Sequence, residues 1–178
     1  MYRGSNPTAI SSMKWLSEAM MDLLKEKQYS KINVKDICTR ADLSRQTFYQ
    51  IFNSKEEIIR HCIKQSFESL EELPKRTDFK SSAAFIAKNI SKNKEFIRLL
   101  SENHLGYMLS EEISLALTAL AERFDPYRSP EKRRLANAFF SAALANSFLE
   151  WSASDSVSEN DFVTLMHSIL SGEYYRIK

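Results

Sequence analysis

The sequence predicts an all-α protein of about nine helices, divided into a small N-terminal domain and a larger C-terminal domain. Apolar residues recur at spacings of three and four along nearly every segment, which is typical of amphipathic helices. The 178 residues include only 3 Gly and 4 Pro, too few for a turn-rich β-sandwich, a collagen-like chain or a disordered one. Helix-capping residues precede most of the periodic segments, so most helices also have a predicted start.

The first two helices are predicted over residues 9–27 and about 34–41. Asn33 can cap the second of them, and Asp36 occupies its third position, where an acidic side chain favours a helix start. The second helix is short. The first helix is defined by its apolar positions Met13, Leu16, Met20, Leu23 and Leu24.

A third short helix is predicted over residues 45–51. Ser44 is a good N-cap, and Leu43 and Phe48 have the spacing of a hydrophobic staple. This helix must begin within about three residues of the end of the second one, and two short helices joined so tightly cross steeply. Residues 32–51 therefore form a predicted helix-turn-helix.

Capping signals also define the helices that follow. Ser54 and Glu57 have the spacing of a capping box, which starts a long fourth helix that Pro74 ends. Ser129 followed by Pro130 is an N-cap with proline at the first helical position, a strong start signal. The helices predicted for the C-terminal domain lie near residues 79–91, 93–103, 110–124, 131–152 and 158–172.

The charge divides unevenly along the chain. Residues 1–62 hold ten Lys or Arg and seven Asp or Glu, net +3, whereas residues 63–178 have a net charge of −1. The sign suits an N-terminal nucleic-acid-binding module on a near-neutral body. We therefore expect a DNA-binding domain over residues 1–63 and a second, helical domain over residues 64–178.

Several other classes of protein are excluded. Cys38 and Cys62 fall at apolar helical positions and form no disulfide framework of the secreted kind. No stretch reaches the roughly 18 apolar residues of a membrane span, and the N-terminus has no signal-peptide core, so a soluble cytoplasmic protein is expected. His61, His104 and His167 are scattered, and the chain has neither a phosphate loop nor a nucleophile elbow. We expect no enzyme, no metal and no cofactor.

The helix over residues 45–51 has side chains that can read DNA. In a helix-turn-helix the second helix lies in the major groove, and here Phe48 and Phe52 point inward and leave polar side chains outside. Arg pairs with guanine, Gln with adenine, and Thr offers a methyl group to thymine, while Tyr49 and Lys55 suit phosphates. The alternative for any one of them is a solvated position. The predicted DNA-binding residues are Ser44, Arg45, Gln46, Thr47, Tyr49, Gln50 and Lys55.

The run VKDICTRADLSRQTFYQIF over residues 34–52, with SKEEI over 54–58, resembles the TetR family of bacterial transcriptional regulators. LLKEKQYSKI, which precedes it, is similar too, and the resemblance covers residues 9–63. It implies repression by operator blockade, relieved by a small ligand in the C-terminal domain. Asp42 stands where the family usually has Gly, but Asp tolerates the left-handed region and should keep the turn intact. The residues that the resemblance brings to DNA are Asn33, Lys35, Arg45, Gln46, Thr47, Tyr49 and Lys55.

The helix over residues 131–152 predicts a contact with a second subunit. It has no charged residue between Leu135 and Leu149, and a helix that is apolar nearly all round is buried on both faces. One face can pack on the core and the other on a second copy. We expect a two-fold homodimer joined by a four-helix bundle of this helix and the one over 158–172. The alternative is a central helix buried inside a monomer.

A pocket for a small hydrophobic effector is expected among the helices between residues 79 and 148. Aromatic residues and Met at helical spacing are also typical of a packed core, which is the alternative for each candidate. The candidate lining residues are Phe85, Phe96, Leu100, His104, Tyr107, Met108, Phe124, Phe139, Phe140 and Phe148.

Two functions follow from this organisation. The first is a homodimeric repressor that a small ligand releases from a palindromic operator. The second is a DNA-bound activator or adaptor controlled by a partner protein. The segment NKEFIRLL over residues 93–100 resembles the C-terminal region of small regulators from low-GC Gram-positive bacteria, some of which are similar to activators that work through a partner.

Overall fold

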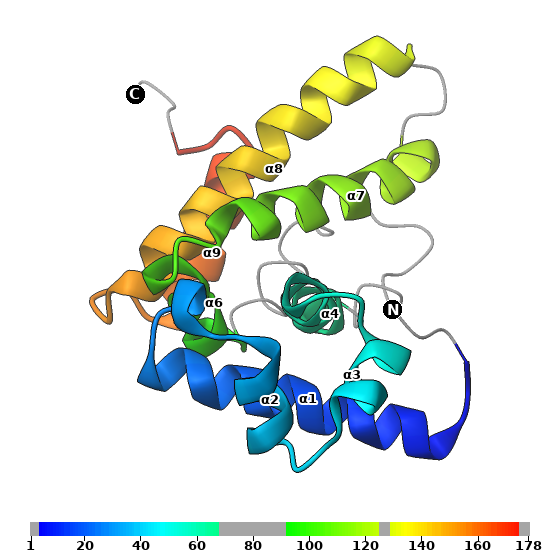
Figure 1. Ribbon diagram of the computed structural model, residues 1–178. Coiled ribbons are helices and arrows are strands. Elements are labelled where there is room, and N and C mark those ends of the chain that lie inside the picture. The colour runs from blue at the N-terminus through cyan, green and yellow to red at the C-terminus, as the bar shows by residue number, and fades with distance from the viewer. Residues whose placement is uncertain (1–3, 68–91, 125–128, 175–178) are drawn as a thin grey trace. The chain divides into compact units, whose positions relative to one another are not determined.

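A computed structural model describes residues 4–67, 92–124 and 129–174 of the chain. These ranges contain eight α-helices, one short 3-10 helix and no strand (Figure 1), so the all-α prediction is confirmed. The backbone divides into two compact units, Met1–Gln65 and Ser66–Lys178. The predicted helix over 79–91, the break at Pro74 and the candidate Phe85 lie outside the described residues, as does the side chain of Phe124.

The first unit contains the predicted helix-turn-helix. Helices α2 and α3 contact each other and both contact α1 (Figure 1). Its core is fully apolar at the contact, with Leu16, Met20, Ile37 and Phe48 at zero exposure. The elements are α1 (Pro7–Glu26), a 3-10 helix (Tyr29–Lys31), α2 (Val34–Arg40), α3 (Arg45–Ile51) and α4 (Lys55–Phe67).

Side-chain caps define where α2 and α3 begin. The Asn33 side chain accepts a hydrogen bond from the Asp36 amide (3.0 Å), and the Asp36 carboxylate accepts one from the Asn33 amide (3.1 Å). Ser44 caps α3 by accepting from the amide of Thr47 (3.0 Å). Each cap satisfies amides that have no partner inside the helix, and both predicted starts are confirmed.

The connection between α2 and α3 is a left-handed turn at Asp42. This residue has φ +52°, and the amide of Leu43 donates to the Cys38 carbonyl (3.0 Å) while that of Asp42 donates to Thr39 (3.4 Å). The pair of bonds is a Schellman motif, which ends one helix and redirects the chain at once. The expected tolerance of Asp at this position is confirmed.

The second unit is built around α8 (Pro130–Ala153), which packs on α6 (Lys94–Glu102) and on α7 (Gly106–Phe124). The predicted start of α7 near residue 110 is wrong by about one turn. Gly106 is its first residue, where a Cβ would lie 2.6 Å from the Leu149 side chain on α8. Glycine therefore allows α7 to approach α8 closely while remaining helical.

Helix α9 (Glu159–Leu170) packs on the C-terminal half of α8 through aromatic rings. Trp151 stacks on Phe162 at 4.6 Å between centroids, and Phe148 lies 5.4 Å from the same ring. The Trp151 indole donates to the carbonyl of Val157 (3.0 Å), in the α8–α9 loop. These contacts fix the angle at which the chain returns from α8.

Helix α6 is fastened to the end of α8 by two cations. Lys94 and Arg98 both bind the Asp155 carboxylate, at 2.8 and 2.9 Å. Lys94 also donates to the Ser154 carbonyl, and Arg98 to that of Ser152. Both cations thus donate to carbonyls that the helix end leaves without partners inside the helix.

In the ranges that the structure describes, no helix is both long and apolar enough to cross a membrane.

The left-handed turn gives the first prediction. Asp42→Val should lower the free energy of unfolding by roughly 1–2 kcal/mol, because a β-branched side chain is strained at positive φ. Asp42→Gly should not destabilise the protein, because glycine adopts this conformation freely. Denaturant unfolding of the two variants tests this. Equal stabilities for Val and Gly would contradict the assigned turn.

Candidate nucleic-acid interface

The recognition face of α3 results from how this short helix is anchored. Phe48 is fully buried and Ile51 nearly so, which fixes one side of the helix against the core. The exposed sides of α3 therefore carry the predicted reading residues: Arg45, Gln46, Tyr49 and Gln50 are exposed and Thr47 is partly so.

Tyr49 is held in an exposed position by the buried ring next to it. Its ring meets Phe48 edge-on, at 5.2 Å between centroids and an interplanar angle of 83°. The Tyr49 side chain nevertheless remains 56% exposed. An anchored ring with an accessible hydroxyl is suited to donate to a phosphate oxygen at low cost in conformational entropy.

Ion pairs inside the unit engage some of its cations. Lys27 binds Asp36 at 2.7 Å, and Arg40 binds Glu26 at 2.9 and 2.7 Å. The hydrogen bond from Lys27 lowers the pKa of Asp36, and the one from Arg40 lowers the pKa of Glu26. Because they join α1 to α2, these pairs hold the helix-turn-helix rather than present charge to a ligand.

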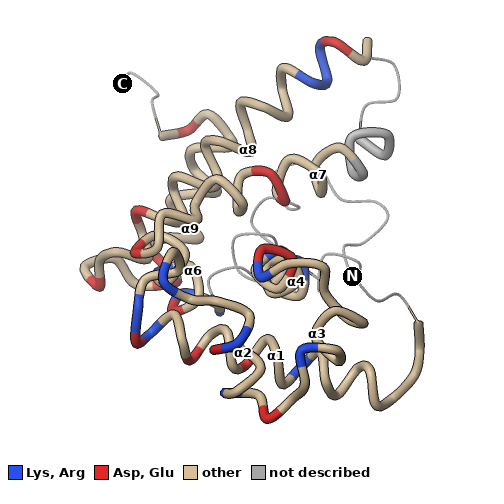
Figure 2. The backbone as a smooth tube through the Cα atoms, viewed as in Figure 1, with Lys and Arg blue, Asp and Glu red and all other residues tan. Residues whose placement is uncertain are grey.

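Three other cations, in the 3-10 helix, α2 and α3, face solvent. Lys31, Lys35 and Arg45 are exposed, and none has a carboxylate within 4 Å in the part of the chain that the structure describes. Figure 2 shows basic positions, in blue, on both α2 and α3. The sequence analysis missed Lys31, whose exposure depends on the 3-10 turn that contains it.

A shallow hollow brings α2 and α3 residues together. It has a volume of about 520 Å³, and Lys35, Ser44 and Arg45 line it with Thr39 and neighbouring residues. Asp42 also lines it, so two cations outnumber one carboxylate around the hollow, and its net charge and hydroxyls are suited to an anionic group such as a phosphate. Asn33 lies at the start of α2, where its side-chain oxygen already accepts the capping hydrogen bond from the Asp36 amide.

Lys55 lies in a different environment from the other predicted residues. Its ammonium donates to the carbonyls of Tyr29 (2.8 Å) and Ile32 (2.7 Å). It also lies 4.0 Å from the centroid of the Tyr29 ring, and the side chain is half-buried. The structure therefore gives Lys55 internal partners that the sequence did not reveal.

The start of α4 is capped through Asn53 as well as through Ser54. The amide of Glu57 donates to Ser54 (3.3 Å), as the capping box requires, but the Glu57 carboxylate accepts from the backbone and side chain of Asn53, both at 2.9 Å. Hydrogen bonds from the Asn53 backbone and then its side chain lower the pKa of Glu57 to about 2. The predicted cap is present, but the backbone amide that donates to the Glu57 carboxylate is that of Asn53 instead of that of Ser54.

Both cysteines are buried free thiols. Burial raises the pKa of Cys38, and raises that of Cys62 to about 11. Thiols of this kind stay protonated at neutral pH and pack as small apolar side chains.

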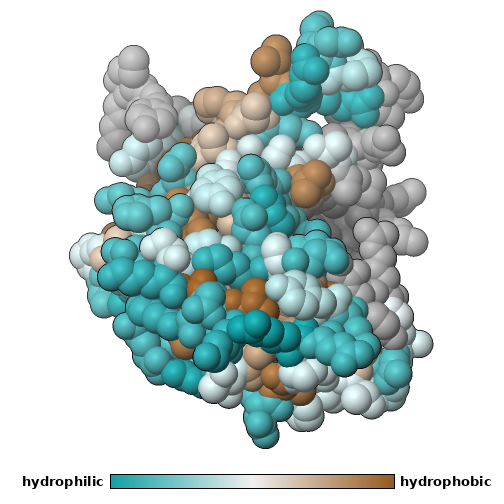
Figure 3. All heavy atoms as spheres, in the orientation of Figure 1, coloured by the Kyte–Doolittle hydropathy of each residue, from teal (hydrophilic) through white to brown (hydrophobic). Residues whose placement is uncertain are grey.

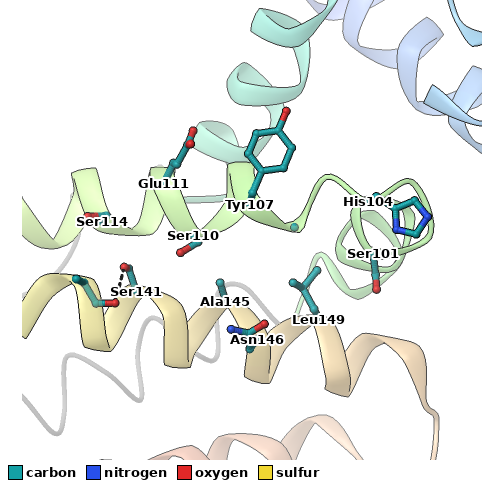
Figure 4. A pocket seen from close by; sticks show the side chains of 12 residues that line it. Ser101, His104, Tyr107, Ser110, Glu111, Ser114, Ser141, Ala145, Asn146 and Leu149 are labelled. Atoms are coloured by element: carbon teal, nitrogen blue, oxygen red, sulfur yellow. Dashed lines mark hydrogen bonds between the residues drawn. The ribbon is translucent and has the colours of Figure 1, made fainter. Parts of the chain in front are cut away.

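The second unit has an open groove between α7 and α8 of about 780 Å³. Ser110, Ser141 and Ala145 lie between the two helices (Figure 4). Small and polar residues dominate this groove. The full lining is Ser101, His104, Gly106, Tyr107, Ser110, Glu111, Ser114, Ala138, Ser141, Ala145, Asn146 and Leu149.

The predicted pocket residues that the structure describes fall in four environments. Of the candidates, His104 and Tyr107 line the groove. Leu100, Met108 and Phe148 have zero exposure and lie in the core, whereas Phe139 is 69% exposed. Phe96 and Phe140 are half-buried outside the groove lining. The helical spacing of these residues predicts that they lie on apolar helix faces. It does not predict whether each face packs in the core or lines a pocket.

Comparison with known proteins finds a family match over the helix-turn-helix. Residues 16–62 match the family model of bacterial regulatory proteins of the tetR family. The chain is 34% identical over 62 residues to the HTH-type dhaKLM operon transcriptional activator DhaS of Lactococcus lactis subsp. lactis (strain IL1403), and the match covers 35% of this chain and 33% of that protein. The chain thus spans about a third of the length of this curated relative.

Two solved structures share the fold over nearly the whole chain. Lin0861 from Listeria innocua has a TM-score of 0.77 at 13% identity, with 97% of this chain and 96% of that one covered. A TetR transcriptional regulator from Streptococcus agalactiae 2603V has a TM-score of 0.61 at 20% identity, with 92% and 95% covered. At these identities the likeness establishes the fold.

The cap at α4 predicts a pH dependence. The pKa of Glu57 is lowered from 4.5 to about 2, so the ionised carboxylate stabilises the fold above pH 4.5, and this stability is lost as the pH falls towards 2. Glu57→Gln should remove part of the loss. The melting temperatures of both proteins at pH 6 and pH 3 test this, and an equal drop in the two would count against the cap.

Proposed function

We propose that the chain is a regulator of the TetR family, whose model matches residues 16–62, and that it acts as a homodimer that binds an inverted-repeat operator through α3. The observation that carries the proposal is the exposed polar face of α3, next to cations that have no carboxylate within 4 Å among the residues that the structure describes. Arg45 and Gln46 have the donor geometry to pair with guanine and adenine edges. Phosphate contacts then fix the register of the helix on the duplex.

We assign the remaining contacts by exposure and chemistry. Lys35 and Tyr49 are exposed groups suited to phosphates, and Ser44 and Asn33 present polar groups at the helix starts, where amides also favour anions. Thr47 and Gln50 lie on the same short helix as Arg45 and Gln46 and are assigned to base edges.

The surface of α8 supports dimerisation. Its inner side buries Leu144, Ala145 and Phe148, whereas Leu135 and Phe139 on its outer side are 70% and 69% exposed. Exposed small residues continue that outer side at positions 142 and 143. Elsewhere hydrophobic residues occur as separate patches among hydrophilic ones on the face shown in Figure 3. We propose that this side of α8, with α9, forms a four-helix bundle with a second copy.

The regulatory outcome we propose is repression that a small ligand relieves, with the groove between α7 and α8 as the site for the ligand. Its serines, Asn146 and His104 favour a polar ligand over the hydrophobic one that the sequence suggested. The second candidate is activation with a partner protein. One observation favours it: the relative from Lactococcus lactis is named as a transcriptional activator.

The DNA contacts are tested by comparing base-reading with phosphate-contacting variants. Arg45→Ala and Gln46→Ala should each relax base preference at one position per half-site, by about 1–3 kcal/mol. Lys35→Ala should instead weaken binding to all sequences, and should reduce the slope of log K against log salt by about 0.9 for each protomer, or about 1.8 for the dimer. Fluorescence anisotropy on matched and mismatched duplexes measures both effects. An unchanged base preference in Arg45→Ala would overturn the assignment of α3.

The dimer is tested by placing a charge on the exposed side of α8. Phe139→Asp should give monomers, because a carboxylate would be buried at the proposed interface without a partner. Leu115→Asp is the matched control: Leu115 is also exposed, at 60%, but it lies on α7. Sedimentation velocity reports the mass of each variant. A dimeric Phe139→Asp protein would contradict the proposed interface.

A further inference from the structure

The ammonium of Lys55 is held by groups of the first unit, and its side chain is half-buried. Two of its three N–H groups donate to the carbonyls of Tyr29 and Ile32, at 2.8 and 2.7 Å, and the Tyr29 ring lies 4.0 Å away. Burial lowers the pKa of Lys55. An ammonium that contacts phosphate needs to face the solvent from which DNA approaches, as Lys35 does.

The position of Lys55 in its helix supports the same conclusion. It is the first residue of α4, where the helix dipole is positive and disfavours a cation. Glu56 and Glu57 follow it in the first turn and have the charge that this position favours. The two carbonyl oxygens and the ring face of Tyr29 provide the negative potential that offsets the dipole.

The carbonyls that Lys55 binds belong to the segment leading into α2. Tyr29 and Ile32 are the first residue and the C-cap of the 3-10 turn, and the amide of Ile32 donates to the Tyr29 carbonyl at 3.1 Å. Ile32 is 2% exposed and directly precedes Asn33, the N-cap of α2. One side chain of α4 therefore holds both ends of the turn that sets where α2 begins.

We propose that Lys55 is a positioning residue, which fixes the start of α2 against α4 and thereby aims α3, rather than a ligand for DNA phosphate. The effect on DNA rests on the proposed function, whereas the effect on the helix-turn-helix does not. Only residues 41–44 separate the end of α2 from the start of α3. A displacement of Ile32 should therefore move α3 as well, because no flexible loop lies between the two helices.

The first test needs no DNA. Lys55→Met keeps the aliphatic stem and removes the charge, so amide hydrogen exchange over residues 29–51 should become at least several-fold faster, while that of α6 to α9 stays unchanged. Lys35→Met is the matched control: it removes an exposed cation of α2 and should leave this exchange as in the parent protein. Unchanged exchange over residues 29–51 in Lys55→Met would overturn the proposal.

The second test separates positioning from phosphate contact. On a 30-base-pair duplex of mixed sequence, Lys35→Met should reduce the slope of log K against log salt by about 0.9 for each bound protomer, whereas Lys55→Met should leave that slope unchanged. On a duplex selected by the parent protein, Lys55→Met should lower the preference for that sequence at least tenfold. Tyr29→Leu, which keeps the charge of Lys55, should shift the preference in the same direction.

The outcomes are distinguishable. A salt slope reduced in Lys55→Met as much as in Lys35→Met would show a phosphate contact and overturn the proposal. Full sequence preference in Lys55→Met would also overturn it, because positioning would then not affect α3. A parent protein with no sequence preference would contradict the proposed function, and the hydrogen-exchange test would still decide the role of Lys55.

Discussion

The left-handed turn at Asp42 is the constraint on which the recognition surface depends. With no loop between α2 and α3, the direction of α3 is set by one residue at φ +52° and by the bond from the Leu43 amide to the Cys38 carbonyl. Phe48 then buries one side of α3 completely. The polar side chains are exposed as a consequence of these two facts, because a helix of seven residues anchored on one side has little freedom to rotate.

Charge is used in two different ways in this protein. Some cations hold elements together: Lys55 at the start of α4 and Lys94 at the start of α6 each bind backbone carbonyls and lie over an aromatic ring, at 4.0 and 4.7 Å from its centroid. Others, such as Lys35 and Arg45, are exposed and have no carboxylate partner within the described residues. The net positive charge of the N-terminal region therefore overstates how many cations can meet DNA.

Local signals made most of the fold predictable. The bounds of α3 follow from Ser44 and the residues beside it, because caps act within one turn. Contacts distant in sequence were not predictable: Gly106 resembles a helix break until Leu149 is seen against it, and the partners of Lys55 lie 23 and 26 residues away. The candidate pocket depended on such contacts throughout. Helical spacing places Phe139 on an apolar face, but only packing shows that this face of the single chain is uncovered.

The most direct test of the account is a selection of bound fragments from the source genome, using the purified protein at near-physiological salt. Sequence-specific reading by two copies of α3 predicts that one or a few fragments are recovered, which share an inverted repeat with half-sites one helical turn apart or a multiple of it. Unselective binding that disappears as salt is raised would contradict it, because the exposed face of α3 would then contribute charge without reading the bases.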